Sequence, residues 1–164
     1  MPINSIAANM RLLWFILAAL IFSVPIRGEA QSVLQSRGQT VYVPIYSHIY
    51  SGDKEMPLYL TAVCSIRNID TDMSIIIDTV DYYDSEGRLL EHYLKSALVI
   101  KPLASVRYLV KESDTKGGSG AKFIVRWKSE LPVNAPLVEG IMIGTRMQQG
   151  ISFVSRGIVI EERQ

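Results

Sequence analysis

The two histidines of the chain would have to anchor any metal site. His48 has Asp53 and Glu55 nearby in sequence, and His92 follows Glu91. Zinc is held by about three or four ligands at fixed geometry, and such sites commonly show histidine or cysteine pairs at short spacing. Because this chain has no such pair, we expect neither a metal nor another cofactor.

The densest acidic stretch contains Asp78, Asp81, Asp84 and Glu86. Calcium takes roughly six to eight oxygen ligands, and the loops that bind it place acidic residues at a spacing that this stretch lacks. Strand alternation would also put Asp78 and Asp81 on opposite faces. We therefore interpret these carboxylates as solvated residues of a turn.

The nucleophiles of the chain carry no catalytic signature. Ser119 lies in the glycine-rich segment 117–120, which does not form a Gly-x-Ser-x-Gly motif. The same segment lacks the lysine that follows the last glycine of a phosphate-binding loop, since Lys122 comes later. Cys64 shares one strand face with the small and apolar residues Leu60, Ala62 and Ile66 and has no neighbouring cation in sequence, so we expect it in the core. No catalytic residue is assigned.

Three arginines are candidates for an anion site. Arg126, Arg146 and Arg156 would form one if their strands were neighbours, because arginine forks suit carboxylates and phosphates. The alternative is ordinary surface charge paired with Glu130 or Glu139.

The aromatic residues near position 46 are more distinctive. Tyrosines that point outward from β-strands give a rigid amphipathic surface for a protein or sugar partner. We predict a partner-binding or ligand-binding surface made of Tyr46, His48, Tyr50, Arg146 and Arg156.

The first residues have the features of a secretory signal. Arg11 precedes an uncharged apolar run over residues 12–22, and Gly28 and Ala30 offer the small side chains that signal peptidase accepts. The run is shorter than the about 20 residues that span a membrane. We predict an N-terminal signal helix, cleavage after Ala30, and a periplasmic or secreted product. The alternative is an uncleaved inner-membrane anchor made of residues 12–26.

The charge balance argues against a nucleic-acid partner. Removal of residues 1–30 takes away Arg11, Arg27 and Glu29, which leaves 15 basic and 15 acidic side chains. Proteins that bind nucleic acids carry a clustered positive excess, because phosphate neutralisation supplies most of their affinity.

The sequence after residue 39 has the texture of an all-β domain. Short β-branched and aromatic runs alternate with Gly, Asn, Asp and Pro clusters. The clearest run, residues 121–128, puts Phe123 and Trp127 on one face and basic residues on the other. We predict an immunoglobulin-like antiparallel β-sandwich over residues 39–160, with a small barrel as the alternative. Residues 31–38 would be a tether, and residues 161–164 a tail.

The same pattern bounds individual elements. Pro44 cannot donate to a ladder, so the first strand, at residues 41–46, should lie at a sheet edge. Gly140 should mark a β-bulge or a close backbone approach. Further expected elements are a loop at 47–55, a strand at 58–66, a hairpin of 75–83 with 88–93, a turn bracketed by Pro132 and Pro136, and a last strand at 151–160.

Several short segments together resemble a known family. They are TVYVPIYSHIY at 40–50, SIRN at 65–68, VDYYD at 80–84, GGSG at 117–120, PV at 132–133, MIGT at 142–145 and QGIS at 149–152. With them the chain resembles a family of uncharacterised bacterial exported domains, catalogued as a domain of unknown function. The resemblance covers nearly all of residues 39–160 and implies no activity or cofactor. Some members resemble lipoproteins, but this chain has no cysteine just after its apolar run.

These observations together predict a non-enzymatic exported module for binding or assembly. Its partner would be an envelope or extracellular protein, with membrane contact only through an uncleaved N-terminal segment. A module that binds a small ligand or carbohydrate through the tyrosines is the alternative, and an enzyme with a site built from distant loops is the third reading.

Overall fold

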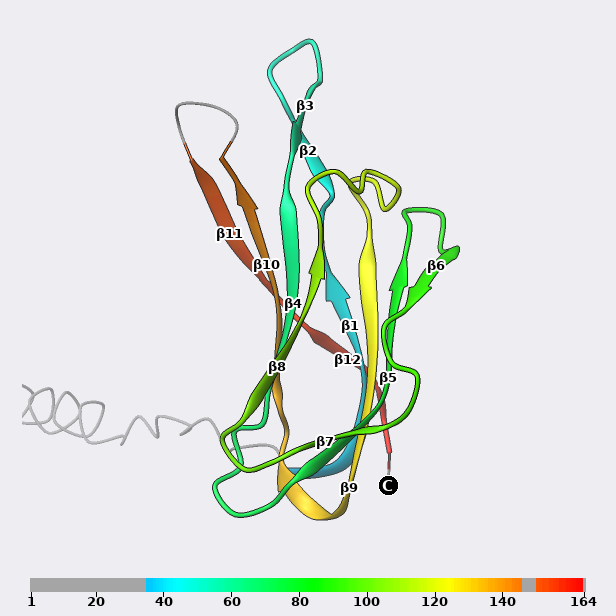
Figure 1. Cartoon of the computed structure of the whole chain (residues 1–164), viewed down its shortest axis with the longest axis vertical. Helices are drawn as coiled ribbons and strands as arrows, with labels where there is room; N and C mark the ends of the chain where they lie inside the picture. The colour runs from blue at the N-terminus through cyan, green and yellow to red at the C-terminus, as the bar shows by residue number, and fades with distance from the viewer. Residues whose placement is uncertain (1–34, 146–149, 164) are drawn as a thin grey trace, which may run out of the picture. The chain divides into compact units, whose positions relative to one another are not determined.

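The computed structural model describes residues 35–145 and 150–163 (Figure 1). Over these residues the regular elements are all β-strands, and the sheets are antiparallel. No helix in this part of the chain is long and apolar enough to cross a membrane. The signal helix expected over residues 1–30 and the candidate residue Arg146 lie outside the described residues.

The strands form two main sheets and one separate hairpin. The larger sheet has the order β12 (Ile158–Glu162), β1 (Gln35–Pro44), β9 (Lys122–Asn134), β5 (Ile75–Tyr83) and β6 (Leu89–His92), with β7 (Leu98–Ile100) also paired to β5. The smaller sheet has the order β11 (Ile151–Arg156), β10 (Leu137–Gly144), β4 (Thr61–Arg67) and β8 (Ser105–Val110). The hairpin pairs β2 (His48–Ser51) with β3 (Met56–Tyr59).

One hydrophobic core draws residues from both sheets, as in a β-sandwich. Phe123 and Trp127 of β9 are fully buried, and so is Cys64 of β4, which confirms the inward phase predicted for these strands. The ring of Tyr93 lies with its centroid 5.4 Å from that of Tyr108 in the smaller sheet and 5.4 Å from that of Phe123 in the larger one. Aromatic packing therefore joins the two sheets.

The sheets also meet at Gly140, where the sequence suggested a bulge or a close approach. A Cβ atom at this position would lie 2.6 Å from the carbonyl oxygen of Pro44 and 2.6 Å from Oγ of Ser155. The Ser155 hydroxyl donates a hydrogen bond to the same carbonyl. Because both ladders of β10 run through Gly140 without a register shift, the glycine serves a close approach.

The expectation that the first strand lies at a sheet edge is wrong. β1 lies between β9 and β12, since the end of the chain returns to pair Glu162 with Gln39 and Ile158 with Tyr42. Pro44 comes after the last of these pairs, so it ends the strand and does not interrupt the β12 ladder.

Both ends of the domain extend further than expected. β1 begins at Gln35, within the segment 31–38 that we expected to be a tether. β12 reaches Glu162, within the expected tail 161–164. The side chains of Glu162 and Gln39 are joined by a hydrogen bond of 3.0 Å, which ties the end of the chain to β1.

Some segments that we expected to be single elements are divided in the structure. The expected loop 47–55 contains β2 and the tip of a hairpin, and the expected strand 58–66 breaks at Leu60, between β3 and β4. The last run divides at Gly157, where a Cβ atom would lie 2.7 Å from Cγ1 of Val41. Because glycine has no Cβ atom, the chain can pass close to Val41 where it moves from the smaller sheet to the larger one. The hairpin of β5 with β6 is confirmed.

The turn expected between Pro132 and Pro136 begins later, because β9 continues to Asn134. Between the pairs Gly38 with Lys128 and Ser36 with Val133, the register of β9 against β1 shifts. Pro132 lies in this irregular part, where no ladder bond needs its missing N–H.

Candidate functional site

The outer face of the smaller sheet carries an apolar row that crosses all four strands. Strand alternation buries Ala62, Cys64 and Ile66 of β4, so Val63 points to the other side. In register across the sheet lie Val154, Ile141, Val63 and Leu109, which we call the apolar row. Its outer members are open, with Val154 58% and Leu109 49% exposed. Isolated exposed apolar residues are ordinary, whereas these four lie side by side on neighbouring strands.

A polar row lies beside the apolar row. On each strand the two rows are separated by one residue that faces inward. The polar row consists of Arg156, Glu139, Ser65 and Arg107, in that order across the sheet. On the far side of this row, Arg67 is paired in register with Ser105. The Nε atom of Arg67 donates a hydrogen bond of 3.3 Å to Oγ of Ser65. Among the described residues, none of the three arginines forms an ion pair with a carboxylate.

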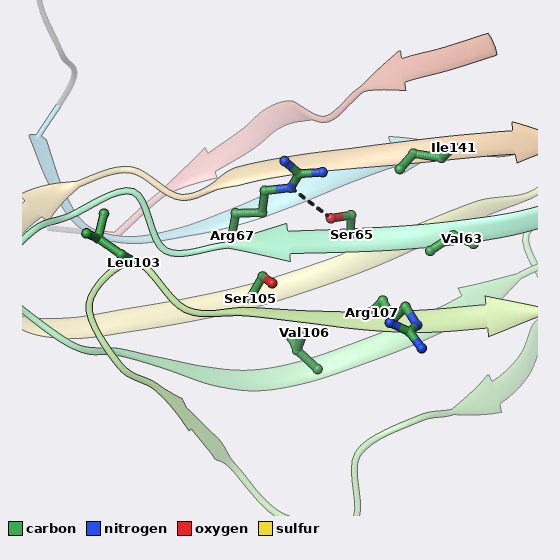
Figure 2. Close-up of a pocket in the computed structure, with 8 residues that line it drawn as sticks. All are labelled: Val63, Ser65, Arg67, Leu103, Ser105, Val106, Arg107 and Ile141. Carbon is green, nitrogen blue, oxygen red and sulfur yellow. Dashed lines mark hydrogen bonds between the residues drawn. The ribbon is translucent and has the colours of Figure 1, made fainter.

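A groove of about 440 Å³ runs along β4 over these residues (Figure 2). Val63 and Ile141 lie at one end, and Leu103 lies at the other. Between the two ends Figure 2 shows the remaining outward lining residues, Ser65, Arg67, Ser105 and Arg107. The groove therefore has a basic, hydroxyl-bearing centre and apolar ends.

Leu103 holds a backbone conformation that leucine rarely adopts. Its φ is +58°, in the left-handed region, and its side chain is 69% exposed. Its N–H donates a hydrogen bond of 3.2 Å to the carbonyl of Asp70, which fixes the turn between β7 and β8. An observed outlier of this kind suggests a functional use of the residue.

The aromatic residues predicted from the sequence divide into two groups. His48 and Tyr50 lie together on β2, with 3.0 Å between Nε2 and the phenolic oxygen, and Tyr50 is 54% exposed. The Tyr59 ring lies across the hairpin, with its centroid 6.2 Å from that of His48. Tyr46 is half-buried against Phe153, with 5.7 Å between ring centroids.

The predicted arginine group does not form from the residues that are described. Arg126 lies on β9 of the larger sheet, 3.7 Å from a carboxylate oxygen of Asp81. Arg156 ends β11 of the smaller sheet, opposite Glu139 in the ladder. Arg67 and Arg107, which sequence analysis did not select, lie on the neighbouring strands β4 and β8 of the smaller sheet.

Two carboxylates expected to be solvated are in fact buried. Asp81 is 5% exposed and contacts Nδ1 of His92 at 2.7 Å, and Asp84 is 2% exposed and pairs with Arg88 at 2.7 Å. Burial would raise the pKa of Asp84, but hydrogen bonds and the charge of Arg88 outweigh burial and lower this pKa. Within residues 35–145 and 150–163, no cluster of three or more His, Cys, Asp or Glu could hold a metal ion.

A usable signal for the outer face was present in the sequence. Val63 and Leu109 are apolar although they occupy the outward phase of their strands, so β4 and β8 are partly apolar on both faces. What the sequence did not indicate is that these strands are neighbours. Register alone places Arg107 beside Ser65 and Arg67 beside Ser105.

Comparison with known proteins gives a family and no activity. The profile of the family described as "Protein of unknown function (DUF3124)" matches residues 38–160, so the chain belongs to that family. No curated protein matches the sequence. A solved structure, described as the crystal structure of Thermotoga maritima 1070, is similar with 11% identity and a TM-score of 0.44, over 78% of this chain and 97% of that one.

Proposed function

We propose that this member of the family of unknown function is a non-enzymatic, exported module that binds or assembles with an envelope or extracellular protein. The observation that carries the proposal is the apolar row on the outer face of the smaller sheet. Four outward apolar side chains in register form a surface about 14 Å wide across three strand spacings. Such a row is unusual on the solvent side of an antiparallel sheet.

The energetics of the row favour a protein partner. Covering half-exposed valine and leucine side chains contributes roughly 1 kcal/mol each, from about 25 cal/mol per Å² of apolar surface removed from water. The adjacent polar row supplies donors and charges that set the orientation of the partner, as the rim of a protein interface does.

Capture of the partner tests this proposal with a matched pair of variants. Leu109→Asp places a charge in the apolar row, while Val99→Asp places the same charge on β7 of the larger sheet, where Val99 is 58% exposed. We expect the tagged wild type and V99D to retain the same envelope protein and L109D to lose it. Equal retention by all three would remove the outer face as the binding surface.

Export is part of the proposal and rests on residues 1–30. A cationic start, a short apolar run and small residues before the cleavage point support it. Sequencing the N-terminus of the protein from its host should give a chain beginning at Gln31. A membrane-bound chain that still begins with the apolar run would favour the anchor of residues 12–26.

The immunoglobulin-like form of the sandwich is also a proposal, and the central strand pairs support it. β4 pairs with β8 in one sheet and β5 pairs with β9 in the other, as the B and E strands and the C and F strands pair in an immunoglobulin domain. The terminal strands differ from that arrangement, since β1 pairs with β9 and β10 pairs with β4.

A second candidate function is carbohydrate or small-ligand binding by the β2–β3 hairpin. The exposed ring of Tyr50 beside His48 supports it. Calorimetric titration with a panel of envelope and extracellular sugars tests it, with Tyr50→Ala as the variant. Binding that Tyr50→Ala abolishes and Leu109→Asp leaves unchanged would favour this function over the first.

A further inference from the structure

Four outward residues in the groove form a square on two neighbouring strands. Ser65 of β4 is opposite Arg107 of β8, and Arg67 of β4 is opposite Ser105. The two arginines therefore occupy one diagonal of the square, and the two serines occupy the other. Opposite Cβ atoms in such a ladder are about 5 Å apart and diagonal ones about 7–8 Å apart. Two guanidinium groups at this spacing can reach one small anion above the serines.

The square has donors but no acidic partner in the described part of the chain. Arg67 uses its Nε–H on Ser65, and its terminal nitrogen atoms and the whole guanidinium of Arg107 make no ion pair there. Arginine presents its N–H donors in a planar fork that matches the two oxygen atoms of a carboxylate. Hydrogen bonds of this charged kind are roughly twice as strong as neutral ones.

The ends of the groove indicate what carries the anion. Val63 and Ile141 form one apolar end and the strained, exposed Leu103 forms the other. From Val63 to Arg67 the strand advances by about 13 Å, and Leu103 lies beyond Arg67 at the far end of the groove (Figure 2). The groove therefore fits an extended peptide segment that carries an acidic side chain between two apolar ones.

We propose that Arg67 and Arg107 together bind a side-chain carboxylate of an extended segment of the protein partner, with Ser65 and Ser105 as further donors. The site rests on the proposed function, since the partner is the protein held on the outer face. An anionic membrane surface fits less well, because it favours clusters of several basic residues. Here Glu139 lies in the same polar row, and basic and acidic residues balance after removal of residues 1–30.

Nuclear magnetic resonance titration of the purified protein, in the form that its host accumulates, tests the site with defined probes. The probes are the blocked peptide Leu-Ser-Glu-Ser-Leu, the same peptide with glutamine in place of glutamate, and inorganic phosphate. We expect the glutamate peptide to shift the backbone amides of Ser65, Ser105 and Arg107 in a saturable way. The glutamine peptide and phosphate should each bind about tenfold more weakly, since the first lacks the carboxylate and the second lacks the apolar side chains.

Two variants that each replace one arginine by glutamine show which arginine binds the peptide. Arg107→Gln should weaken binding of the glutamate peptide about tenfold, whereas Arg37→Gln, at an exposed position of β1 in the larger sheet, should leave it unchanged. Both side chains are exposed, and an unchanged melting temperature checks that both variants fold. Equal losses in the two variants, equal binding of the glutamate and glutamine peptides, phosphate binding as tight as the glutamate peptide, or no shift with any probe would each overturn the proposal.

Failure of this site and failure of the proposed function give different results. If Arg107→Gln still captures the envelope partner while Leu109→Asp does not, the carboxylate site is wrong and the outer face still binds. If Leu109→Asp captures the partner as well as the wild type, the outer face is wrong as the partner surface, whatever the peptides show.

Discussion

The left-handed backbone of Leu103 lowers the stability of the fold, while its exposed apolar side chain lies at the end of the groove. A left-handed backbone costs a residue with a Cβ atom roughly 1–2 kcal/mol, whereas glycine adopts it freely and loses only about 0.5–1 kcal/mol of backbone entropy. Leu103→Gly should therefore stabilise the protein by up to about 1 kcal/mol in denaturant unfolding, and weaken capture of the partner. A loss of stability would show that the leucine packs usefully in the free protein.

Cys64 gives the fold a dependence on alkaline pH. Burial raises the pKa of its thiol from 9.0 to about 12. Between these values the unfolded thiol is ionised and the folded one is not, so the unfolded state binds fewer protons. The stability linked to Cys64 is thus complete below about pH 9 and is lost as the pH rises towards 12. Between about pH 8 and 10.5, denaturant unfolding should show a larger loss of stability for the wild type than for Cys64→Ala, and parallel curves would contradict the burial.

Trp127 is fully buried, but its indole Nε1 has no hydrogen-bond partner among the described residues. Trp127→Ala should destabilise the protein by roughly 3–5 kcal/mol, because it leaves a large cavity. Trp127→Phe should cost about 2 kcal/mol less, since the phenyl ring fills most of the space that alanine leaves empty. Denaturant unfolding measures both variants, and equal costs would contradict tight packing around the indole.

Local patterns at single residues were good predictors of local structure. The alternation around Cys64 and Trp127 indicated their burial, and the short connection after residue 83 indicated the hairpin that β5 and β6 form. Arg67 and Arg107 could not be selected in this way. Their importance comes from a contact between strands that are about 40 residues apart, which no local pattern encodes.

Gly140 controls how closely β10 approaches the end of β1. Gly140→Ala should destabilise the protein by roughly 1–3 kcal/mol, because the new methyl group would contact the Pro44 carbonyl and the Ser155 hydroxyl at 2.6 Å each. Gly150→Ala is a matched control, since a Cβ atom there has no neighbour within 4 Å. Thermal unfolding compares the stability of the two variants. An equal loss of stability would show that the two sheets accommodate a methyl group at Gly140 without strain.

The existence of strands was predictable, but their boundaries and partners were not. The run 151–160 has apolar or β-branched residues at both ends and no strong turn signal, so it looks like one strand, although Gly157 divides it between two sheets. Likewise, Pro44 indicated a strand at a sheet edge, but the return of the chain end supplied β1 with a second neighbour, β12. Sheet order depends on contacts between distant residues, whereas alternation reports only which face of a strand is buried.

The proposed binding surface forms only when the whole domain folds, so it could not be predicted from the sequence. Val154, Ile141, Val63 and Leu109 come from four strands spread over much of the chain, and only the order β11-β10-β4-β8 makes them a row. The predicted aromatic surface came from a single segment, and the structure keeps only His48 and Tyr50 of it together on β2.

Site-specific photo-cross-linking in the native envelope tests the outer face most directly. A photoreactive side chain would replace Leu109, Val154 or, as the control on the larger sheet, Val99, which is as exposed as Val154. We expect the same cross-linked partner from positions 109 and 154 and none from position 99. Absence of an adduct at both positions of the apolar row, or an equal adduct at position 99, would contradict the claim that this face binds a protein.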